Sequence, residues 1–169
     1  MILIDTTVLS NFVLARVPLL LKEFCGSQGG ITQQVLAEFE RGVQQEVLPA
    51  TALHWLTTVR LQHARDHALF SRLQACLGAG EASCLALTLS QRQSFLSDDM
   101  KARRMARSLG VPVSGSVGVL VALIRARRLT CAEGNQVLRR FIAAGYFSPV
   151  QRLDDLLPVA LPGCAMIHV

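Results

Sequence analysis

Short apolar runs alternate along this chain with longer segments of helical periodicity. Met1–Ile4 is an apolar run that stops at a carboxylate, which is typical of a buried strand. Further short strands are expected at 29–32, 94–97 and 111–113, whereas 53–61 fits either a strand or a helix. Strands that alternate with helices predict an α/β fold with a mostly parallel central sheet.

Apolar positions three and four residues apart, together with capping residues, mark the helices. The clearest stripe is formed by Ala102, Met105, Ala106 and Leu109, and Gly110 ends that helix. Thr130 and Glu133 have the spacing of a capping box at the start of a helix that ends near Gly145. The other helices are expected at 7–25 with a break at Pro18, from Thr32 to a stop at Gly42, at 64–76, from Glu81 onward, at 119–128, and in a short segment that starts at Ser148 and Pro149.

The length of 169 residues predicts one domain, which we place at residues 1–157. The apolar tail at 158–169 is expected to pack on this domain or on a second subunit, as in a homodimer. Hydrophobic residues make up 51% of the chain and charged residues 17%, which excludes a disordered chain. No uninterrupted apolar stretch reaches the roughly 18–20 residues of a membrane span. The N-terminus lacks the basic region of a signal peptide, so we expect a cytoplasmic protein without a membrane partner.

The spacing of the cysteine and histidine residues does not predict a metal-binding site. The five cysteines include no C-x-x-C pair and are expected to be reduced thiols. His63 and His67 lie four residues apart with Asp66 between them, but no third ligand has a suitable spacing. We therefore interpret this pair as part of a solvated helix face.

Carboxylates at strand ends and helix starts are the strongest chemical signal. Asp5 and Asp98 follow predicted strands, Asp99 comes next, Glu81 begins a helix, and Glu38 lies near the edge of an apolar helix face. The carboxyl ends of parallel strands meet at one edge of a sheet, where ligands bind. Converging carboxylates repel one another by roughly 1 kcal/mol at 4 Å in water and about 4 kcal/mol at an effective dielectric of 20. Such a cluster either holds protons or binds a hard cation, Mg²⁺ or Mn²⁺, which suits phosphoryl chemistry. Taken singly, each acid could instead cap a helix or lie solvated at the surface.

The basic side chains suggest a polyanionic partner. The net charge is +5, and fifteen of the 17 basic residues are arginines, whose planar fork suits phosphate. Lys101, Arg103, Arg104 and Arg107 lie on the polar side of the helix that follows the Asp pair and could hold an RNA backbone. The alternative is a solvated helix face with an Asp99–Arg103 pair.

Five motifs in the same order along 1–157 resemble those of PIN-domain ribonucleases. They are Asp5-Thr6-Thr7-Val8-Leu9, Glu38 within Leu36-Ala37-Glu38-Phe39, Gly80-Glu81-Ala82, Asp98-Asp99-Met100-Lys101-Ala102-Arg103, and Gly115-Ser116-Val117-Gly118-Val119-Leu120. The third and fourth are similar to the G-E-x and D-D-x-x-A-R motifs of a bacterial, VapC-like subfamily. One departure is that Glu81 stands where most PIN domains carry Asp.

The resemblance implies a three-layer α/β/α fold with strand order 3-2-1-4-5. It also implies a Mg²⁺- or Mn²⁺-dependent endoribonuclease, often the toxin of a toxin–antitoxin pair with a small antitoxin protein as partner. By this resemblance the catalytic acids are Asp5, Glu38, Glu81 and Asp98, and the metal ligands come from Asp5, Glu81, Asp98 and Asp99. We expect Asp98 rather than Asp99 to reach the metal, Asp99 to cap the next helix, and Thr7 to orient Asp5 by a hydrogen bond.

Two other folds that carry such acids do not match this sequence, and one non-catalytic interpretation stays open. A haloacid-dehalogenase-like phosphatase needs a second Asp two residues after Asp5, where this chain has Thr7. A receiver domain carries its acid pair after the first strand, which also fails here. The remaining alternative is a catalytically weak module of the same fold that binds RNA or a protein, although an aromatic content of 5% argues against base stacking as its main task.

Overall fold

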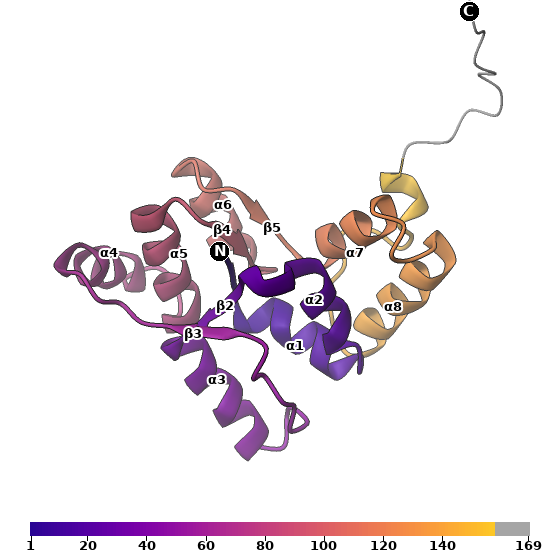
Figure 1. Ribbon diagram of the computed structural model, residues 1–169, viewed down its shortest axis with the longest axis horizontal. Helices are drawn as coiled ribbons and strands as arrows, with labels where there is room; N and C mark the ends of the chain where they lie inside the picture. Colours follow the sequence, from indigo (N-terminus) through magenta and orange to yellow (C-terminus); the bar gives the residue numbers. More distant parts are fainter. Residues whose placement is uncertain (158–169) are drawn as a thin grey trace, which may run out of the picture.

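The computed structural model describes residues 1–157, which form a five-stranded, all-parallel sheet flanked by helices (Figure 1). The strand order is β3-β2-β1-β4-β5, so the predicted α/β fold and its 3-2-1-4-5 order are confirmed. The strands are β1 (Ile2–Ile4), β2 (Gly29–Thr32), β3 (Thr57–Val59), β4 (Ser94–Leu96) and β5 (Val113–Ser114). The ambiguous segment 53–61 therefore contains an edge strand.

Helices cover the sheet on both sides. In Figure 1, α4 and α5 lie on one side of the sheet and α1, α2, α7 and α8 on the other. The helices are α1 (Thr6–Leu14), α2 (Pro18–Cys25), α3 (Gln33–Gln44), α4 (Ala64–Gln74), α5 (Ala79–Gln91), α6 (Met100–Ser108), α7 (Ser116–Arg125) and α8 (Cys131–Ala143), with short 3₁₀ helices η1 (Gly26–Gln28) and η2 (Asp154–Leu156).

The register of the two central strands brings their carboxyl ends together. Ile4 of β1 lies opposite Leu96 of β4, and the backbone N–H of Asp5 donates to the Leu96 carbonyl at 2.9 Å. Next to this, the N–H of Ser97 donates to the carbonyl of Ser114 at the end of β5, at 3.0 Å. The residues after β1, β4 and β5 therefore lie side by side.

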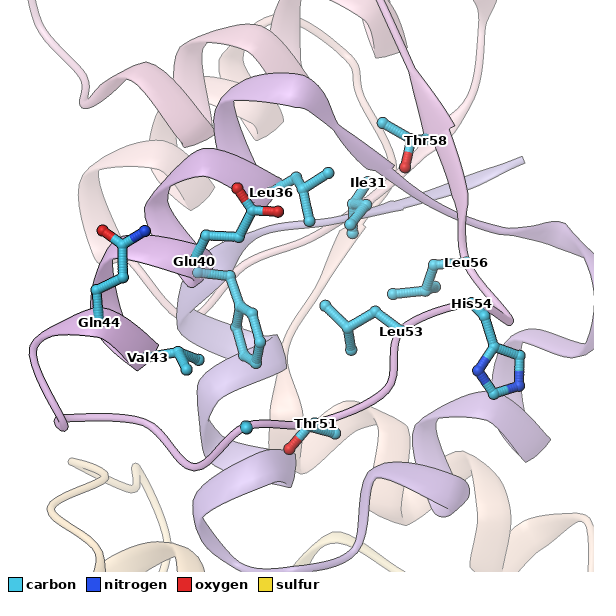
Figure 2. Close-up of a pocket in the computed structure, with 12 residues that line it drawn as sticks. Ile31, Leu36, Glu40, Val43, Gln44, Thr51, Leu53, His54, Leu56 and Thr58 are labelled. Atoms are coloured by element: carbon cyan, nitrogen blue, oxygen red, sulfur yellow. The ribbon is translucent and has the colours of Figure 1, made fainter.

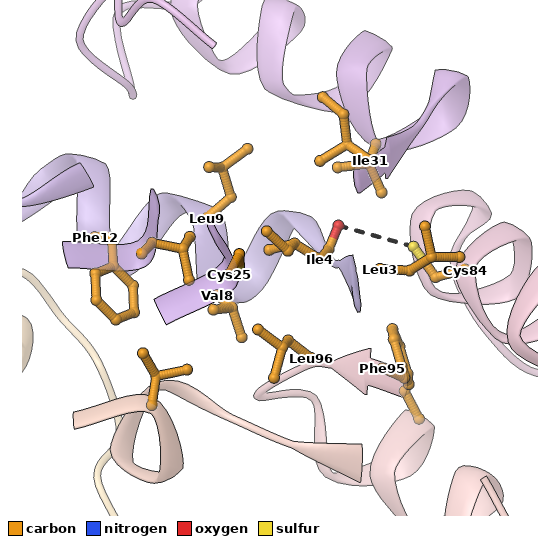
Figure 3. Packing of buried hydrophobic residues seen from close by; sticks show 14 of the residues in the cluster. Leu3, Ile4, Val8, Leu9, Phe12, Cys25, Ile31, Cys84, Phe95 and Leu96 are labelled. Carbon is orange, nitrogen blue, oxygen red and sulfur yellow. Dashed lines mark hydrogen bonds between the residues drawn. The ribbon is translucent and has the colours of Figure 1, made fainter. Parts of the chain in front are cut away.

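Apolar side chains around the central strands hold these ends in place (Figure 3). Leu3 and Phe95 from the strands and Val8 and Phe12 from α1 are fully buried. The ring of Phe12 also meets Phe141 of α8, edge to face, with centroids 4.9 Å apart. Because a close-packed interior resists displacement, the loops after β1 and β4 start from fixed points.

Several predicted helix limits are wrong. Gly42 does not end α3, which continues to Gln44, and its lack of a Cβ leaves room for Leu48, whose Cδ1 lies 2.8 Å from where that Cβ would be. Helix α7 begins at Ser116 rather than at 119. No helix begins at Ser148 and Pro149, because the Ser148 hydroxyl bonds the main chain of Val150 instead, at 2.6 Å to its carbonyl.

Two sequence predictions about helix ends are confirmed. Pro18 separates α1 from α2, and Thr130 and Glu133 form the expected capping box of α8. The four cysteines within residues 1–157 are free thiols. No helix in this part of the chain is long and apolar enough to cross a membrane. The predicted apolar tail at 158–169, with Cys164, lies outside the described residues.

Candidate functional site

A hollow of about 600 Å³ lies where β1 and β4 end, and we call it the acidic hollow. Four of the predicted acids reach it from different elements: Glu38 from α3, Glu81 from α5, and Asp98 and Asp99 from the loop after β4. The rest of its lining comes from Thr6, Thr7, Ser10 and Asn11 of α1 and from Gly145, Tyr146 and Phe147 after α8.

Asp5 is the fully buried acid next to this hollow. Its Oδ2 accepts hydrogen bonds from the Thr7 hydroxyl at 2.7 Å and the Ser97 hydroxyl at 3.1 Å, so the contact expected from Thr7 is present. Its Oδ1 is buried and has no hydrogen-bond partner among residues 1–157. Burial and, second, the charge of Glu81 raise the pKa of Asp5 to about 7, although the two hydroxyls favour the charged form.

Glu81 couples the acids to one another. It lies in the first turn of α5, where burial raises the pKa of its carboxyl, and the charges of Glu38 and Asp99 raise that pKa further. The N–H groups of the same helix turn oppose this shift. Because Glu81 also acts on Asp5, four acids from four segments share one region of negative potential.

Glu38 is held in a fixed position at the rim of the hollow. Its Oε2 accepts a hydrogen bond from the Thr6 hydroxyl at 2.6 Å, and its Oε1 accepts one from the backbone N–H of Gly80 at 2.8 Å. A Cβ at Gly80 would overlap the Glu38 carboxylate. Glycine at this position therefore lets the Glu38 carboxylate take up its hydrogen bond to the Gly80 N–H without being displaced.

Asp98 is fully engaged by protein donors. Its Oδ1 accepts from the Ser116 N–H at 2.9 Å and from the Tyr146 hydroxyl at 3.2 Å. Its Oδ2 accepts from the Asn11 amide at 2.9 Å and from the Ser116 hydroxyl at 2.5 Å. A carboxylate has about four acceptor positions, so these four bonds leave Asp98 little capacity for another ligand.

Asp99 combines a capping role with a free oxygen. Its Oδ1 accepts from the Ala102 N–H at 2.6 Å, which confirms the predicted cap of α6. Its Oδ2 accepts no hydrogen bond from residues 1–157, and its charge acts on Glu81. Of the two neighbouring acids, Asp99 is thus the one that faces the other carboxylates electrostatically.

The donor set fits a hard divalent cation. Within residues 1–157, no three Asp, Glu, His or Cys side chains already converge at metal-binding geometry. The orphaned Oδ1 of Asp5 nevertheless supplies a buried anionic oxygen that protein donors leave free. Oxygen ligands of this kind, several of them charged, are the ones that Mg²⁺ and Mn²⁺ prefer.

A second hollow, of about 450 Å³, adjoins the acidic hollow, and we call it the arginine groove. Three of the predicted RNA-binding residues, Arg103, Arg104 and Arg107, line it, and Lys101 does not. Arg103 donates its Nη1 to the Ser97 carbonyl at 2.9 Å, whereas Arg104 and Arg107 are exposed. Asp98, Tyr146 and Phe147 line both hollows and so connect them.

A further hollow, of about 550 Å³, is of a different kind (Figure 2). It lies between α3 and the segment before β3, and apolar side chains such as Leu36, Val43 and Leu53 dominate the view. Glu40 is the only carboxylate in its lining. It therefore lacks the convergent acids that make the hollow beside Asp5 a candidate for metal chemistry.

The histidine pair does not form a metal site. His63 is the N-cap of α4, and the Asp66 carboxylate accepts from the N–H groups of Gln62 and His63 at 3.2 and 3.1 Å. His63 and His67 are both exposed. The two imidazoles are thus solvent-exposed, as expected, whereas Asp66 between them is buried.

Three residues that position Asp98 were missed by the sequence analysis. Asn11 lies outside the buried stripe of α1, so its position in the helix gives no sign of a contact with Asp98. Ser116 lies within the motif at 115–120, whose serine and glycine residues indicate a turn but not a bond to a carboxylate. Tyr146 is the single tyrosine of the chain, but nothing in its local sequence points to a carboxylate 48 residues away.

Comparisons with known proteins support one family. The profile of the PIN-domain family DUF3368 matches residues 1–160, nearly the whole chain. No curated protein is significantly similar to the chain. No solved structure is significantly similar either. The family match, together with the parallel 3-2-1-4-5 sheet, shows that this chain belongs to the PIN-domain family.

Proposed function

We propose that this protein is a divalent-metal-dependent endoribonuclease that acts at the acidic hollow. The carrying observation is the buried Asp5 carboxylate, whose Oδ1 lacks a partner in the described residues while burial and, second, the charge of Glu81 raise its pKa. An unpaired buried charge beside a second carboxylate is costly, and a bound cation removes that cost. Membership in the PIN family supports the proposal, because PIN domains are typically metal-dependent nucleases.

Asp5, Glu81 and the Asp98–Asp99 pair are the metal-binding residues in this proposal. The hydrogen bonds favour Asp99 over Asp98 as the third ligand, which reverses the order expected from the sequence. Both oxygens of Asp98 are occupied by Asn11, Ser116 and Tyr146, whereas Asp99 retains a free oxygen. Asp98 then acts as a positioning residue that fixes the loop carrying Asp99.

Each side chain around the hollow has a defined task. Mg²⁺ or Mn²⁺ supplies a Lewis acid for the scissile phosphate and lowers the pKa of water. Thr7 and Ser97 hold Oδ2 of Asp5, which leaves Oδ1 as the oxygen that would bind the metal. Glu38, fixed by Thr6 and the Gly80 N–H, is placed to accept a proton from the water that attacks phosphorus.

The arginine groove supplies the substrate-binding part of the proposal. Arg104 and Arg107 are exposed and line a groove that opens into the acidic hollow, so they can contact phosphates next to the scissile bond. Arg103 donates a hydrogen bond to the Ser97 carbonyl and so steadies the segment after β4 that leads to Asp98. Lys101 contributes only to the positive field of α6.

The wider biological role extends the same proposal. The VapC-like resemblance favours a toxin that a small antitoxin protein holds inactive. The N-terminal sequence favours a cytoplasmic setting, and the apolar sequence at 158–169 favours a homodimer. Growth arrest on expression of the wild-type chain, but not of Asp5→Asn, tests the toxin role. Sedimentation of the purified chain tests the dimer.

The direct test is cleavage of single-stranded RNA with Mg²⁺ or Mn²⁺ and with chelator. We expect metal-dependent cleavage by the wild type and none by Asp5→Asn or Glu81→Gln. Glu40→Gln is the matched control, because Glu40 lies on the same helix as Glu38 but lines the hollow between α3 and the segment before β3. Cleavage that survives in both acid variants would refute the proposal.

The alternative is a catalytically weak module that binds RNA or a protein. The observation that favours it is Glu81, which stands where most PIN domains carry the shorter Asp. RNA binding without cleavage under any metal condition would support this module. Restored cleavage in Glu81→Asp would show that the longer side chain is what limits the chemistry.

A further inference from the structure

Phe147 is the most exposed large apolar side chain in residues 1–157, with 93% of its surface accessible. It belongs to the short segment after α8 and lines both the acidic hollow and the arginine groove. A single exposed apolar residue is ordinary on a protein surface. An aromatic ring at the junction of a phosphate-binding groove and a carboxylate cluster is not explained by packing.

Tyr146, the residue before Phe147, is anchored to the domain, and a local turn follows at Ser148. The Tyr146 hydroxyl donates to Asp98 Oδ1 at 3.2 Å, and its ring meets Phe141 edge to face, with centroids 6.1 Å apart and planes at 87°. The Tyr146 N–H donates to the Phe141 carbonyl at 2.9 Å, and the Val150 N–H donates to the Ser148 hydroxyl at 3.3 Å. The backbone before Phe147 is therefore anchored to the domain, which fixes where its ring projects between the two hollows.

The charges around Phe147 favour a polyanion. Arg104 and Arg107 line the groove on one side of it and are exposed. Asp98 is the one carboxylate in that lining, and its two oxygens are already taken by protein donors. A phosphate chain can thus follow the arginines to the acidic hollow without meeting an unpaired carboxylate before the metal-binding acids.

We propose that Phe147 stacks on a nucleobase of single-stranded RNA whose phosphates lie along Arg104 and Arg107. This inference rests on the proposed RNA substrate but does not require cleavage. Aromatic rings and arginines are the usual combination in single-strand sites, because every base has a π face and every nucleotide a phosphate. An unpaired base is needed, since a base stacked within a duplex has no free face to offer.

The test measures binding of a short labelled oligouridine with Ca²⁺ in place of Mg²⁺, so that cleavage does not enter the readout. We expect Phe147→Ala to bind about tenfold more weakly and Phe147→Trp to bind at least as well as the wild type. Phe147→Leu is the matched control that keeps apolar area but removes the aromatic face, and it should resemble Phe147→Ala. All three changes are at an exposed position and leave the fold intact.

Two further arms separate stacking from charge. An oligomer of abasic nucleotides should bind the wild type and Phe147→Ala equally, because it has no base to stack. The dependence of log affinity on log salt should be unchanged in Phe147→Ala and shallower by about one in Arg104→Ala.

Equal RNA affinity of Phe147→Ala and the wild type would overturn the proposal, and so would the absence of RNA binding by the wild type. Binding by Phe147→Leu as tight as by Phe147→Trp would also overturn it and would favour an apolar protein contact. Phe147-dependent binding without cleavage under Mg²⁺ or Mn²⁺ would reject the nuclease function alone. Cleavage with Phe147-independent binding would reject the stacking alone.

Discussion

The loops after β1 and β4 carry carboxylates in opposite environments. Asp5, after β1, is fully buried with one oxygen unpartnered among the described residues, and its pKa is raised to about 7. Asp98, after β4, is half-buried and accepts four hydrogen bonds. Hydrogen bonds stabilise a carboxylate in the folded state, whereas burial without a partner destabilises it. The comparison teaches that a carboxylate at a strand end can be left with an unpartnered oxygen, as in Asp5, or saturated by donors from distant segments, as in Asp98.

The largest expected effect is on stability without metal. Above pH 7, Asp5→Asn should raise the free energy of unfolding, since it removes a buried charge, whereas Asp98→Asn should lower it by about 1–3 kcal/mol. Each unit by which folding raises the pKa of Asp5 corresponds to about 1.4 kcal/mol in the free energy of unfolding. Urea unfolding in chelator, with equal m values, measures both. Destabilisation by both substitutions would break the comparison.

The pH dependence of the wild type's free energy of unfolding shows whether the raised pKa of Asp5 stabilises or destabilises the fold. The Asp5 pKa rises from 3.8 to about 7 on folding, so between these values the folded state binds more protons than the unfolded state. Stability in chelator should therefore fall as pH increases from about 4 to 7 and then level off. Asp5→Asn should flatten this decline, and Glu81, whose pKa is also raised, accounts for the remainder.

Metal affinity separates the two neighbouring acids. Asp99→Asn should weaken Mn²⁺ binding by about a hundredfold, because Asp99 has a free oxygen near Glu81. Asp98→Asn should weaken Mn²⁺ binding about tenfold, because the loop that carries Asp99 loses its anchor. Titration calorimetry with Mn²⁺ checks both values. The reverse order would restore Asp98 as the ligand, as the sequence predicts.

Thr7 links the two strand ends and should have a smaller effect. Its hydroxyl donates to Asp5 Oδ2 at 2.7 Å and accepts from the Asp98 N–H at 3.0 Å. Thr7→Val should reduce metal affinity about tenfold, and Thr7→Ser should retain it, because only the hydroxyl is needed. Equal affinity of the valine and serine variants would show that this bridge does not orient Asp5.

Gly80 tests whether the position of Glu38 matters. A methyl group at Gly80 would overlap the Glu38 carboxylate, so Gly80→Ala should slow RNA cleavage several-fold, more through kcat than through KM. If the effect passes through Glu38, Gly80→Ala should cause no further loss in a Glu38→Gln background. Additive losses would mean that the substitution disturbs α5 by another route.

The recurring strand-then-acid pattern predicts that Asp5 and Asp98 lie close together, because each follows a short apolar run and a parallel sheet brings such positions to one edge. The structure confirms this proximity. The capping role of Asp99 followed from its place before an amphipathic helix. The partners of Asp98 could not be found this way, because Asn11, Ser116 and Tyr146 come from three helices or loops that meet only after packing.

Local pattern by itself predicted four of the five strands, most helices, the acids at their ends and the arginines on α6, because these depend on periodicity and capping over a few residues. The segment 53–61, which contains β3, fits a helix equally well by pattern. Only the tertiary structure decided which carboxylate is left unpaired and which is saturated, and that Phe147 stands between an acidic hollow and a basic groove. The reason is physical: a carboxylate's pKa and free coordination positions depend on burial and on donors from distant segments. Burial and these donors are set by how the helices pack on the sheet, so no short stretch of sequence contains this information.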